Sequence, residues 1–338
     1  MTNTALASER GATIRPTSKP GPRDQRSWYA RNRLKVAPWL FLAPALIFFM
    51  IYVIIPIFAS ISLSFYQWDG LVAEQAKWVG MDNYARLMDD EKFWTSLKNN
   101  VLWLVLFMLA VPAGLFIALF LNQTAPGMRI YKSLFFFPFV ISQVVVGLVF
   151  FWFYNPEFGV VGKVWGFFFC EQVVNIVGNL STRCSVDPPA LMASEEFATY
   201  GIIAAGLWPQ IAYCMILYLT GLNSVSPDQV EAGRLDGAKG WKMLWYVILP
   251  QLRPATFIAV VVTVIGALRS FDMIAIMTQG GPGVGSTNVL AYYMYEVALS
   301  EFGFRYGYGA AIATVLFLIM LVYISYFLYR MYRDEKGG

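Results

Sequence analysis

Two charged residues inside an apolar segment are the first candidates for chemistry in this chain. Arg269 and Asp272 stand three residues apart in GALRSFDMIAIM, a spacing that places both side chains on one face of a helix. An ionisable group inside a hydrophobic segment indicates a functional site by default, because burying it is costly. Two interpretations stay open: a structural pair that neutralises itself, or a pair that acts with Gln279 to hydrogen-bond a polar solute or gate a cavity.

Other apolar segments also carry polar or aromatic side chains that could contact a polar solute. Amides and hydroxyls would supply hydrogen bonds, and aromatic rings would supply flat surfaces. For each of them, ordinary helix packing is the simpler alternative. The candidates are Ser142, Gln143, Trp152, Trp208, Gln210, Tyr213 and Asn223.

Composition excludes several kinds of chemistry. The chain has no histidine, which removes His-based acid–base catalysis, Ser-His-Asp triads and most zinc sites. Cys170, Cys184 and Cys214 share no CxxC spacing, so no metal site is predicted. A net charge of +4 without a basic stripe does not indicate a nucleic-acid partner. No G-x-x-x-x-G-K-[ST] motif occurs, so the chain is not predicted to hydrolyse a nucleotide itself.

The elements that would position these residues are membrane helices. Hydrophobic residues make up 58% of the 338 residues and charged residues only 14%, too few charges to cover a soluble domain. Six apolar runs reach the length of about 20 residues that a helix needs to cross a bilayer. The sequence therefore predicts an all-α polytopic membrane protein with six spans. The runs are 38–66, 98–122, 130–154, 197–222, 255–277 and 308–330.

The distribution of Lys and Arg predicts the orientation. Seventeen of the 25 lie in the two terminal tails or in the loops on the same side, and seven lie on the other side. By the positive-inside rule both termini are cytoplasmic. Residues 1–37 are predicted to be a disordered basic tail, followed by one transmembrane domain over 38–336.

The loops on the outer side have different characters. Segment 67–97 is Trp-rich and acidic, typical of a short interfacial helix, and 278–307 opens with a glycine-rich stretch that we interpret as a hinge. The outer insert 155–196 contains Cys170 and Cys184, which could form a disulfide there.

The cytoplasmic loop 224–254 has the pattern of two short helices joined by a glycine turn. Ser226, Pro227 and Gln229 form an S-P-x-Q start that predicts an N-cap with a capping box. Gly237 and Gly240 allow a sharp turn. A second helix would place one apolar face at helical spacing and end near two prolines; these residues are Trp241, Leu244, Trp245, Ile248, Pro250 and Pro254. The loop is either an amphipathic surface segment or a docking element for a partner.

This loop resembles a known motif. Glu231-Ala232-Gly233-x-x-Asp236-Gly237-Ala238, followed by Ile248-Leu249-Pro250, is similar to the EAA loop of permease subunits of binding-protein-dependent ABC importers. The opening segment, WVGMDNYARLMDDEKFW and MTQGGPG at 277–283 resemble the carbohydrate-uptake type, related to the larger membrane subunit of the maltose transporter. Gly233 departs from the pattern, which has Ala, and is expected to soften the first helix slightly.

The resemblance implies an assembly and a location. We expect an inner-membrane protein that pairs with a second permease, two ATPase subunits that bind ATP and Mg²⁺, and a periplasmic protein that delivers a carbohydrate. The chain itself would be no enzyme and hold no cofactor. Glu231, Gly237 and the Trp241/Leu244/Trp245 face would dock on the ATPase. An ion-coupled secondary transporter of a small polar solute is the alternative, although only Asp272 is an acid clearly inside a span.

Overall fold

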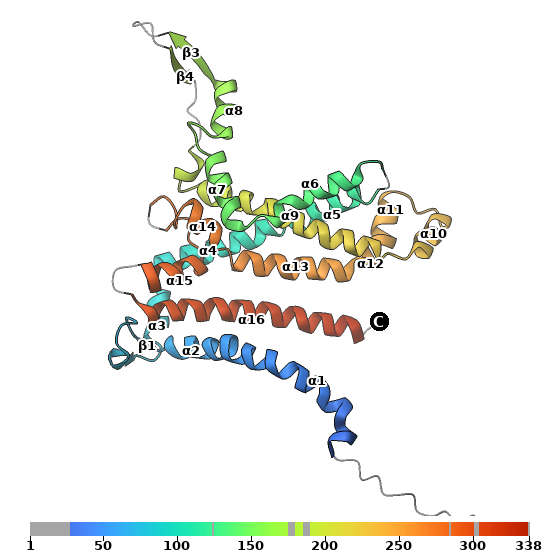
Figure 1. The fold of residues 1–338 in the computed structure, drawn as a ribbon. Coiled ribbons are helices and arrows are strands. Elements are labelled where there is room, and N and C mark those ends of the chain that lie inside the picture. Colours follow the sequence, from blue (N-terminus) through green and yellow to red (C-terminus); the bar gives the residue numbers. More distant parts are fainter. Residues whose placement is uncertain are drawn as a thin grey trace, which may run out of the picture. The chain divides into compact units, whose positions relative to one another are not determined.

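The computed structural model describes residues 28–123, 125–174, 180–184, 190–283, 285–300 and 304–336, and this part of the chain is almost entirely helical, as predicted (Figure 1). The chain consists of two compact units, residues 1–58 and 59–338. Residues 1–27, which make up most of the predicted disordered tail, lie outside the described residues.

The first unit is one continuous helical run. It comprises α1 (Trp28–Phe49), a π-helical turn η1 (Met50–Ile54) and the start of α2 (Ile55–Leu63). α1 begins inside the segment predicted to be a disordered tail, and it includes Pro38 and Pro44. The π turn stands directly before Pro56, and the Ile55 N–H donates to the Met50 carbonyl. A proline has no N–H to continue the α-helical ladder, so a wider turn there accommodates it.

The second unit contains the remaining elements. Its α-helices are α3 (Asp82–Met88), α4 (Glu91–Phe107), α5 (Ala110–Leu121), α6 (Met128–Val140), α7 (Gln143–Phe153), α8 (Val160–Phe169), α9 (Ala198–Asn223), α10 (Pro227–Leu235), α11 (Trp241–Met243), α12 (Leu249–Gln251), α13 (Arg253–Leu268), α14 (Asp272–Met277), α15 (Leu290–Tyr295) and α16 (Tyr306–Lys336). The 3₁₀ helices are η2 (Ala73–Gln75) and η3 (Leu191–Ala193), and the π-helical turns are η4 (Leu244–Ile248) and η5 (Glu296–Ser300).

Two small antiparallel hairpins complete the second unit. β1 (Tyr66–Gln67) pairs with β2 (Lys77–Trp78), and β3 (Cys170–Val174) pairs with β4 (Leu180–Cys184). The first hairpin and α3 replace the single interfacial helix expected over 67–97. The second hairpin, together with α8, occupies the outer insert.

Four helical segments of the described chain are long and apolar enough to cross a membrane: 37–63, 91–121, 198–223 and 306–333. The count reaches six when two bent pairs are each taken as one span. One pair is α6 with α7, bent by 97°, and the other joins the helix 241–251 to α13, bent by 73°. The third predicted run is therefore bent between α6 and α7. The 73° bend lies before the fifth predicted run, which is instead interrupted between α13 and α14.

The centre of the second unit is the crossing of α5 and α9, which run side by side (Figure 1). Gly114 of α5 makes the close approach possible, because a Cβ at this position would lie 2.5 Å from the Cβ of Cys214. Small residues at such crossings let helix backbones approach closely in membranes. Ala110, Ala118, Met215 and Tyr218 pack around this crossing. A second apolar cluster around Trp103, Phe107 and Val146 joins α4, α7, α9 and α14.

Candidate functional site

Two helix breaks bring polar residues to the interior of the second unit. α6 ends at Val140, two residues after Pro138, and α7 starts after the N-cap Ser142, whose hydroxyl accepts from the Val145 N–H at 3.4 Å. α13 ends at Leu268, and α14 starts at Asp272. The prediction that Arg269 and Asp272 share one helical face was wrong, because the helix ends between them.

The break after α13 occurs where a straight helix would still be inside the bilayer. The 16 residues of α13 span about 24 Å at 1.5 Å per residue. This length is less than the ~30 Å thickness of the hydrocarbon core. Non-helical backbone at membrane depth is tolerated only where protein or a water-filled cavity surrounds it. Discontinuous helices of this kind line the solute sites of many transporters.

A cavity of about 340 Å³ lies against both breaks. Four residues that the sequence singled out line it: Gln143 from the start of α7, Gln210 from α9, and Arg269 and Asp272 from the α13–α14 junction. Segments about 60 residues apart in the chain therefore contribute to one polar cavity. It contains four of the residues predicted to contact a solute, and whether they do so stays a prediction.

The two charged residues of this cavity are held apart by the helix ends. Arg269 is the C-cap of α13, where the helix dipole favours a cation, and Asp272 is the first residue of α14. Among the contacts of the described residues, no hydrogen bond or ion pair joins them. The Gln210 amide already makes one hydrogen bond within the protein, because its Nε2 donates to the Thr263 hydroxyl at 2.9 Å. The cavity thus presents one cation, one anion and amide groups to a solute.

The sequence did not single out the apolar part of this cavity. Trp103 and Phe107, one turn apart on α4, form a tilted ring pair with centroids 4.8 Å apart, and Phe271 stands in the α13–α14 break. Within a long apolar run, nothing distinguishes an aromatic side chain that faces a cavity from one that faces lipid. Ser270 also lines the cavity, and its hydroxyl donates to the Gly266 carbonyl at 3.1 Å.

The other predicted solute contacts lie elsewhere. Trp152 is 62% exposed, Trp208 packs edge-on against Phe150, and Tyr213 stacks on Phe139 with ring centroids 4.9 Å apart. Gln279 has a positive φ of 50° and follows the end of α14, where its N–H donates to the Ile274 carbonyl. None of these residues lines the cavity as the structure describes it.

The loop 224–254 forms the predicted helix–turn–helix. α10 ends in a Schellman motif: the Ala238 N–H donates to the Gly233 carbonyl at 2.8 Å, and the Gly237 N–H donates to the Arg234 carbonyl at 3.1 Å. Gly237 has φ of +83°, as this motif requires. Glu231, Ala232, Asp236 and Gly237 are exposed. The turn therefore presents the motif residues to a partner.

The start of α10 differs from the predicted capping box. Ser226 is the N-cap and Pro227 the first helical residue, as expected, but the Ser226 side chain makes no capping hydrogen bond. Instead, the Gln251 side chain accepts from the Ser226 backbone N–H at 3.0 Å and donates to the Val247 carbonyl at 2.9 Å. A residue from the second helix thus ties the two ends of the loop together. Sequence spacing cannot indicate such a long-range cap.

The second helix of the loop contains a π turn, η4, directly before the Leu249-Pro250 pair. The extra residue in this turn rotates the face that i, i+3, i+4 spacing predicts. Trp241 and Trp245 are 72% and 60% exposed rather than packed, while Met243 is buried and Val247 is half-buried. Of the face predicted to dock on an ATPase, both tryptophans are exposed and Leu244 is half-buried; the docking itself stays a prediction.

Gly233 is explained by this packing. It is the one buried residue of α10, and a Cβ at this position would lie 2.9 Å from Val247 Cγ2 and 3.4 Å from Met243 Cε. Glycine at this position lets the two helices of the loop touch. The expectation that Gly233 only softens α10 missed this contact.

At the end of the second unit that was predicted to face outward, α4 holds the glycine-rich segment in place. The Asn99 side chain donates to the Ser286 and Asn288 carbonyls, each at 2.8 Å, and Asn100 Oδ1 accepts from the Leu290 N–H at 2.8 Å. Thr278 and Thr287 share a hydroxyl hydrogen bond of 2.8 Å. The described part of the segment is a set of hydrogen-bonded turns, and the hinge interpretation stays a prediction.

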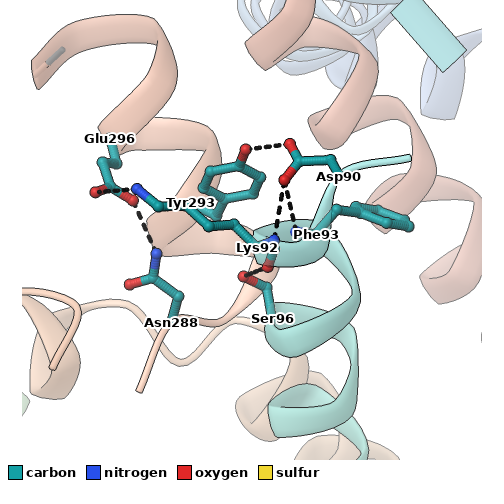
Figure 2. Close-up of polar contacts among 7 residues, drawn as sticks. All are labelled: Asp90, Lys92, Phe93, Ser96, Asn288, Tyr293 and Glu296. Carbon is teal, nitrogen blue, oxygen red and sulfur yellow. Dashed lines mark hydrogen bonds and ion pairs between the residues drawn. The ribbon is translucent and has the colours of Figure 1, made fainter. Parts of the chain in front are cut away.

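Asp90, the N-cap of α4, connects three elements at this outer end (Figure 2). Its carboxylate accepts from the Lys92 and Phe93 N–H groups and from the Tyr293 and Tyr308 hydroxyls. Burial alone would raise the pKa of this carboxyl, but the tyrosine and backbone hydrogen bonds outweigh it and hold the pKa below its usual value. Beside it, Lys92 pairs with Glu296 at 3.3 Å, and Asn288 donates to Glu296 (Figure 2). Together these contacts fix α15 against α4.

The hairpin of the outer insert places Cys170 directly opposite Cys184 in its register. Antiparallel partners have Cα atoms about 4.5–5.5 Å apart, within the range that a disulfide spans. The side chains of this hairpin lie outside the described part of the structure, so the disulfide stays a prediction.

Comparison with known proteins agrees with this architecture. Residues 110–334 match the family described as the binding-protein-dependent transport system inner membrane component. A probable ABC transporter permease protein of Pyrococcus horikoshii is 36% identical over 298 residues, which cover 88% of this chain and 96% of that protein. The multiple sugar-binding transport system permease protein MsmF of Streptococcus mutans is 32% identical, with 83% and 90% covered.

A solved structure shows the same fold. A chain of a bacterial ABC transporter that imports the acidic polysaccharide alginate superposes with a TM-score of 0.73 at 22% identity, covering 90% of this chain and 97% of that one. The ion-coupled alternative is not favoured by any of these relatives. The chain belongs to the family of binding-protein-dependent transport system inner membrane components, a membrane transport component rather than an enzyme.

Proposed function

We propose that the chain forms half of the translocation pathway of an ATP-driven carbohydrate importer and that the cavity at the two helix breaks contacts the solute. The observation that carries the proposal is the convergence of Gln143, Gln210, Arg269 and Asp272 on one cavity at the α13–α14 break. Arg269 and Asp272 balance each other's charge in the same cavity, which favours a hydroxyl-rich neutral solute over an anion. The aromatic ring of the half-buried Phe271, which lines the cavity, suits the apolar face of a sugar ring.

The cytoplasmic loop supplies the coupling in this proposal. The exposed side chains of Glu231, Trp241 and Trp245 stand on a rigid Schellman turn that includes Gly237, and a partner groove could receive them as one unit. Because the sequence contains no P-loop, the ATP and Mg²⁺ would be bound by ATPase subunits on the cytoplasmic side. Both termini of the chain would lie on that side, as the distribution of Lys and Arg indicates.

The remaining partners follow from the family. A second, different permease would complete the pore, and a periplasmic protein would deliver the solute. The alginate importer with this fold has been crystallised in complex with a pentasaccharide-bound periplasmic protein, which supports such an arrangement. The names of MsmF and of the arabinooligosaccharides permease AraP of Bacillus subtilis, 28% identical, support carbohydrate as the solute class.

The test begins with the periplasmic binding protein that this proposal assigns to the transporter. A thermal-shift screen against neutral and acidic sugars identifies the solute, and uptake of that labelled sugar is then measured in vesicles that contain the whole transporter. Gln143→Leu removes an amide from the cavity wall and should lower uptake about tenfold or more. Gln123→Leu makes the same change at an exposed position outside the cavity and should leave uptake unchanged. Equal uptake by both variants would contradict the assignment of the cavity.

A further inference from the structure

A second cavity, of about 540 Å³, lies at the other end of the unit from the coupling loop and is larger than the candidate solute cavity. Its walls come from the β1–β2 hairpin, α3, the N-cap of α4 and the start of α16. The residues that line it are Gln67, Trp68, Asp69, Gln75, Lys77, Asn83, Arg86, Asp90, Phe304, Arg305 and Tyr308. Each lies within about two dozen residues of a span end at 63, 91 or 306. The cavity therefore stands at one membrane–water interface.

The walls of this cavity are preorganised. The buried Asn83 side chain donates to the Ser64 and Tyr66 carbonyls, at 2.8 and 3.0 Å, which fixes α3 against the start of the hairpin. The Trp68 indole N–H donates to the Val72 carbonyl, and the Trp68 ring lies 5.9 Å from that of Tyr306. A site whose walls are already held by hydrogen bonds binds a ligand without a large ordering cost.

The two acids of this cavity have hydrogen-bond partners within the protein, whereas two of its cations have none among the described residues. Asp90 already accepts from two tyrosines and two backbone N–H groups, and Asp69 accepts from the Leu71 N–H. Lys77 and Arg86, by contrast, make no ion pair and no side-chain hydrogen bond within the described residues. The cavity therefore offers two uncommitted cationic groups, which favour an anionic group as the ligand.

The surface around the cavity is apolar. Leu71, Trp78, Met81, Met88 and Trp94 are each about half exposed or more, and they belong to the same hairpin, α3 and the start of α4. Trp side chains concentrate at membrane interfaces, where an apolar ring sits at the level of the head groups. An anionic group bound between Lys77 and Arg86 would thus have apolar surface beside it.

We propose that this cavity binds the head group of an anionic phospholipid, with the phosphate between Lys77 and Arg86 and the acyl chains along the neighbouring apolar side chains. Exposed cations and exposed apolar side chains on the same hairpin and helices suit a lipid, whereas a free anion would use the cations alone. Basic pockets between membrane helices bind lipid head groups by the same electrostatics. The site would be independent of the solute cavity.

The experiment measures lipid retention by the purified transporter complex. Native mass spectrometry counts palmitoyl-oleoyl phosphatidylglycerol bound to the complex during titration, with phosphatidylcholine as the zwitterionic reference. Lys77→Gln/Arg86→Gln should weaken phosphatidylglycerol binding about tenfold or more relative to wild type. Lys98→Gln/Lys163→Gln removes two exposed cations from outside the cavity and should retain the wild-type affinity.

Each other outcome overturns the proposal. Equal binding by the two double variants would show that the lipid associates through general charge. Competition by inorganic phosphate as strong as that by the lipid would show an anion site without lipid recognition. Unchanged lipid binding with a weaker affinity for the periplasmic binding protein would assign the cavity to an acidic side chain of that protein. Folding of the cavity variant is verified by its assembly into the complex.

Discussion

The Asn99 side chain of α4 donates to the backbone carbonyl of Asn288 at 2.8 Å, and so joins two segments that are 189 residues apart in the chain. The same nitrogen donates to the Ser286 carbonyl, also at 2.8 Å. Asn99 is 7% exposed and Asn288 is fully buried. The glycine-rich segment is therefore fixed to the helix that also carries Trp103 and Phe107 into the solute cavity. We infer that α4 and this segment move together during transport.

Asn99→Ala should destabilise this outer end. It removes the Asn99 donor from the buried Asn288 carbonyl, which costs about 1–3 kcal/mol when water cannot reach that oxygen. The half-buried Ser286 carbonyl loses one donor but still accepts from the Thr199 hydroxyl at 3.5 Å. The measurement is the free energy of unfolding of the detergent-purified chain. Asn223→Ala, at an exposed position at the end of α9, is the control and should change it by less than about 0.5 kcal/mol. Equal effects of the two substitutions would contradict the clamp.

Gly233→Ala restores the residue of the EAA pattern but should impair the loop. The added Cβ would stand 2.9 Å from Val247 Cγ2, and a β-branched side chain has few rotamers with which to move away. We expect reduced ATP-driven uptake or assembly from Gly233→Ala alone. Gly233→Ala/Val247→Ala should recover most of the loss, because the second change makes room. If Val247→Ala gives no rescue, the contact does not explain this glycine.

Stability should depend on Asp90 at acid pH. The pKa of Asp90 lies below its usual 3.8 in the folded state, so its carboxylate stabilises the fold above that pH, and this contribution is lost as the pH falls through the lowered pKa. Asp90→Asn should cost about 1–2 kcal/mol at pH 7, and the difference from wild type should shrink below about pH 4. The exposed neighbour Asp89 provides the control, Asp89→Asn, which should show little difference at either pH.

Thiol labelling tests the outer hairpin. If Cys170 and Cys184 are bonded, as their register allows, the unfolded chain without reductant should label at one thiol, that of Cys214, which is buried in the folded chain. After reduction, three thiols should label. A disulfide closing this short loop would stabilise the hairpin by about 3 kcal/mol. Labelling of three thiols before reduction would show that the bond is absent.

Sequence patterns predicted the membrane class, the helical content and the place of the coupling loop, because apolar length, capping residues and glycine turns are local signals. Polar groups in apolar runs are conspicuous, and four of the predicted solute contacts, Gln143, Gln210, Arg269 and Asp272, line one cavity, whereas Gln279, Trp152, Trp208 and Tyr213 do not. The break at Arg269 was missed, because residues 269–271 contain neither Pro nor Gly and the helix ends there for tertiary reasons. The Gln251 cap and the Asn99 clamp depend on contacts between distant segments, which no local pattern contains.

The packing around Gly233 was misjudged for a related reason. A π turn at Leu244–Ile248 shifts the helical phase by one residue, so the face expected to contain Trp241 and Trp245 is exposed, and Met243 and Val247 turn inward. A hydrophobic pattern with a fixed period cannot indicate where such an extra residue will be accommodated.

The central claim, that the 224–254 loop transmits ATP hydrolysis to transport, is tested most directly by comparing two glycines. Gly237 and Gly127 both have φ of +83° and nothing within 4 Å of an added Cβ, but only Gly237 stands in the coupling loop. ATP-driven uptake of the identified sugar is measured in vesicles that contain the complex. Gly237→Trp should abolish uptake, and Gly127→Trp should retain most of it. Uptake that survives Gly237→Trp, or that both substitutions abolish equally, would contradict the account.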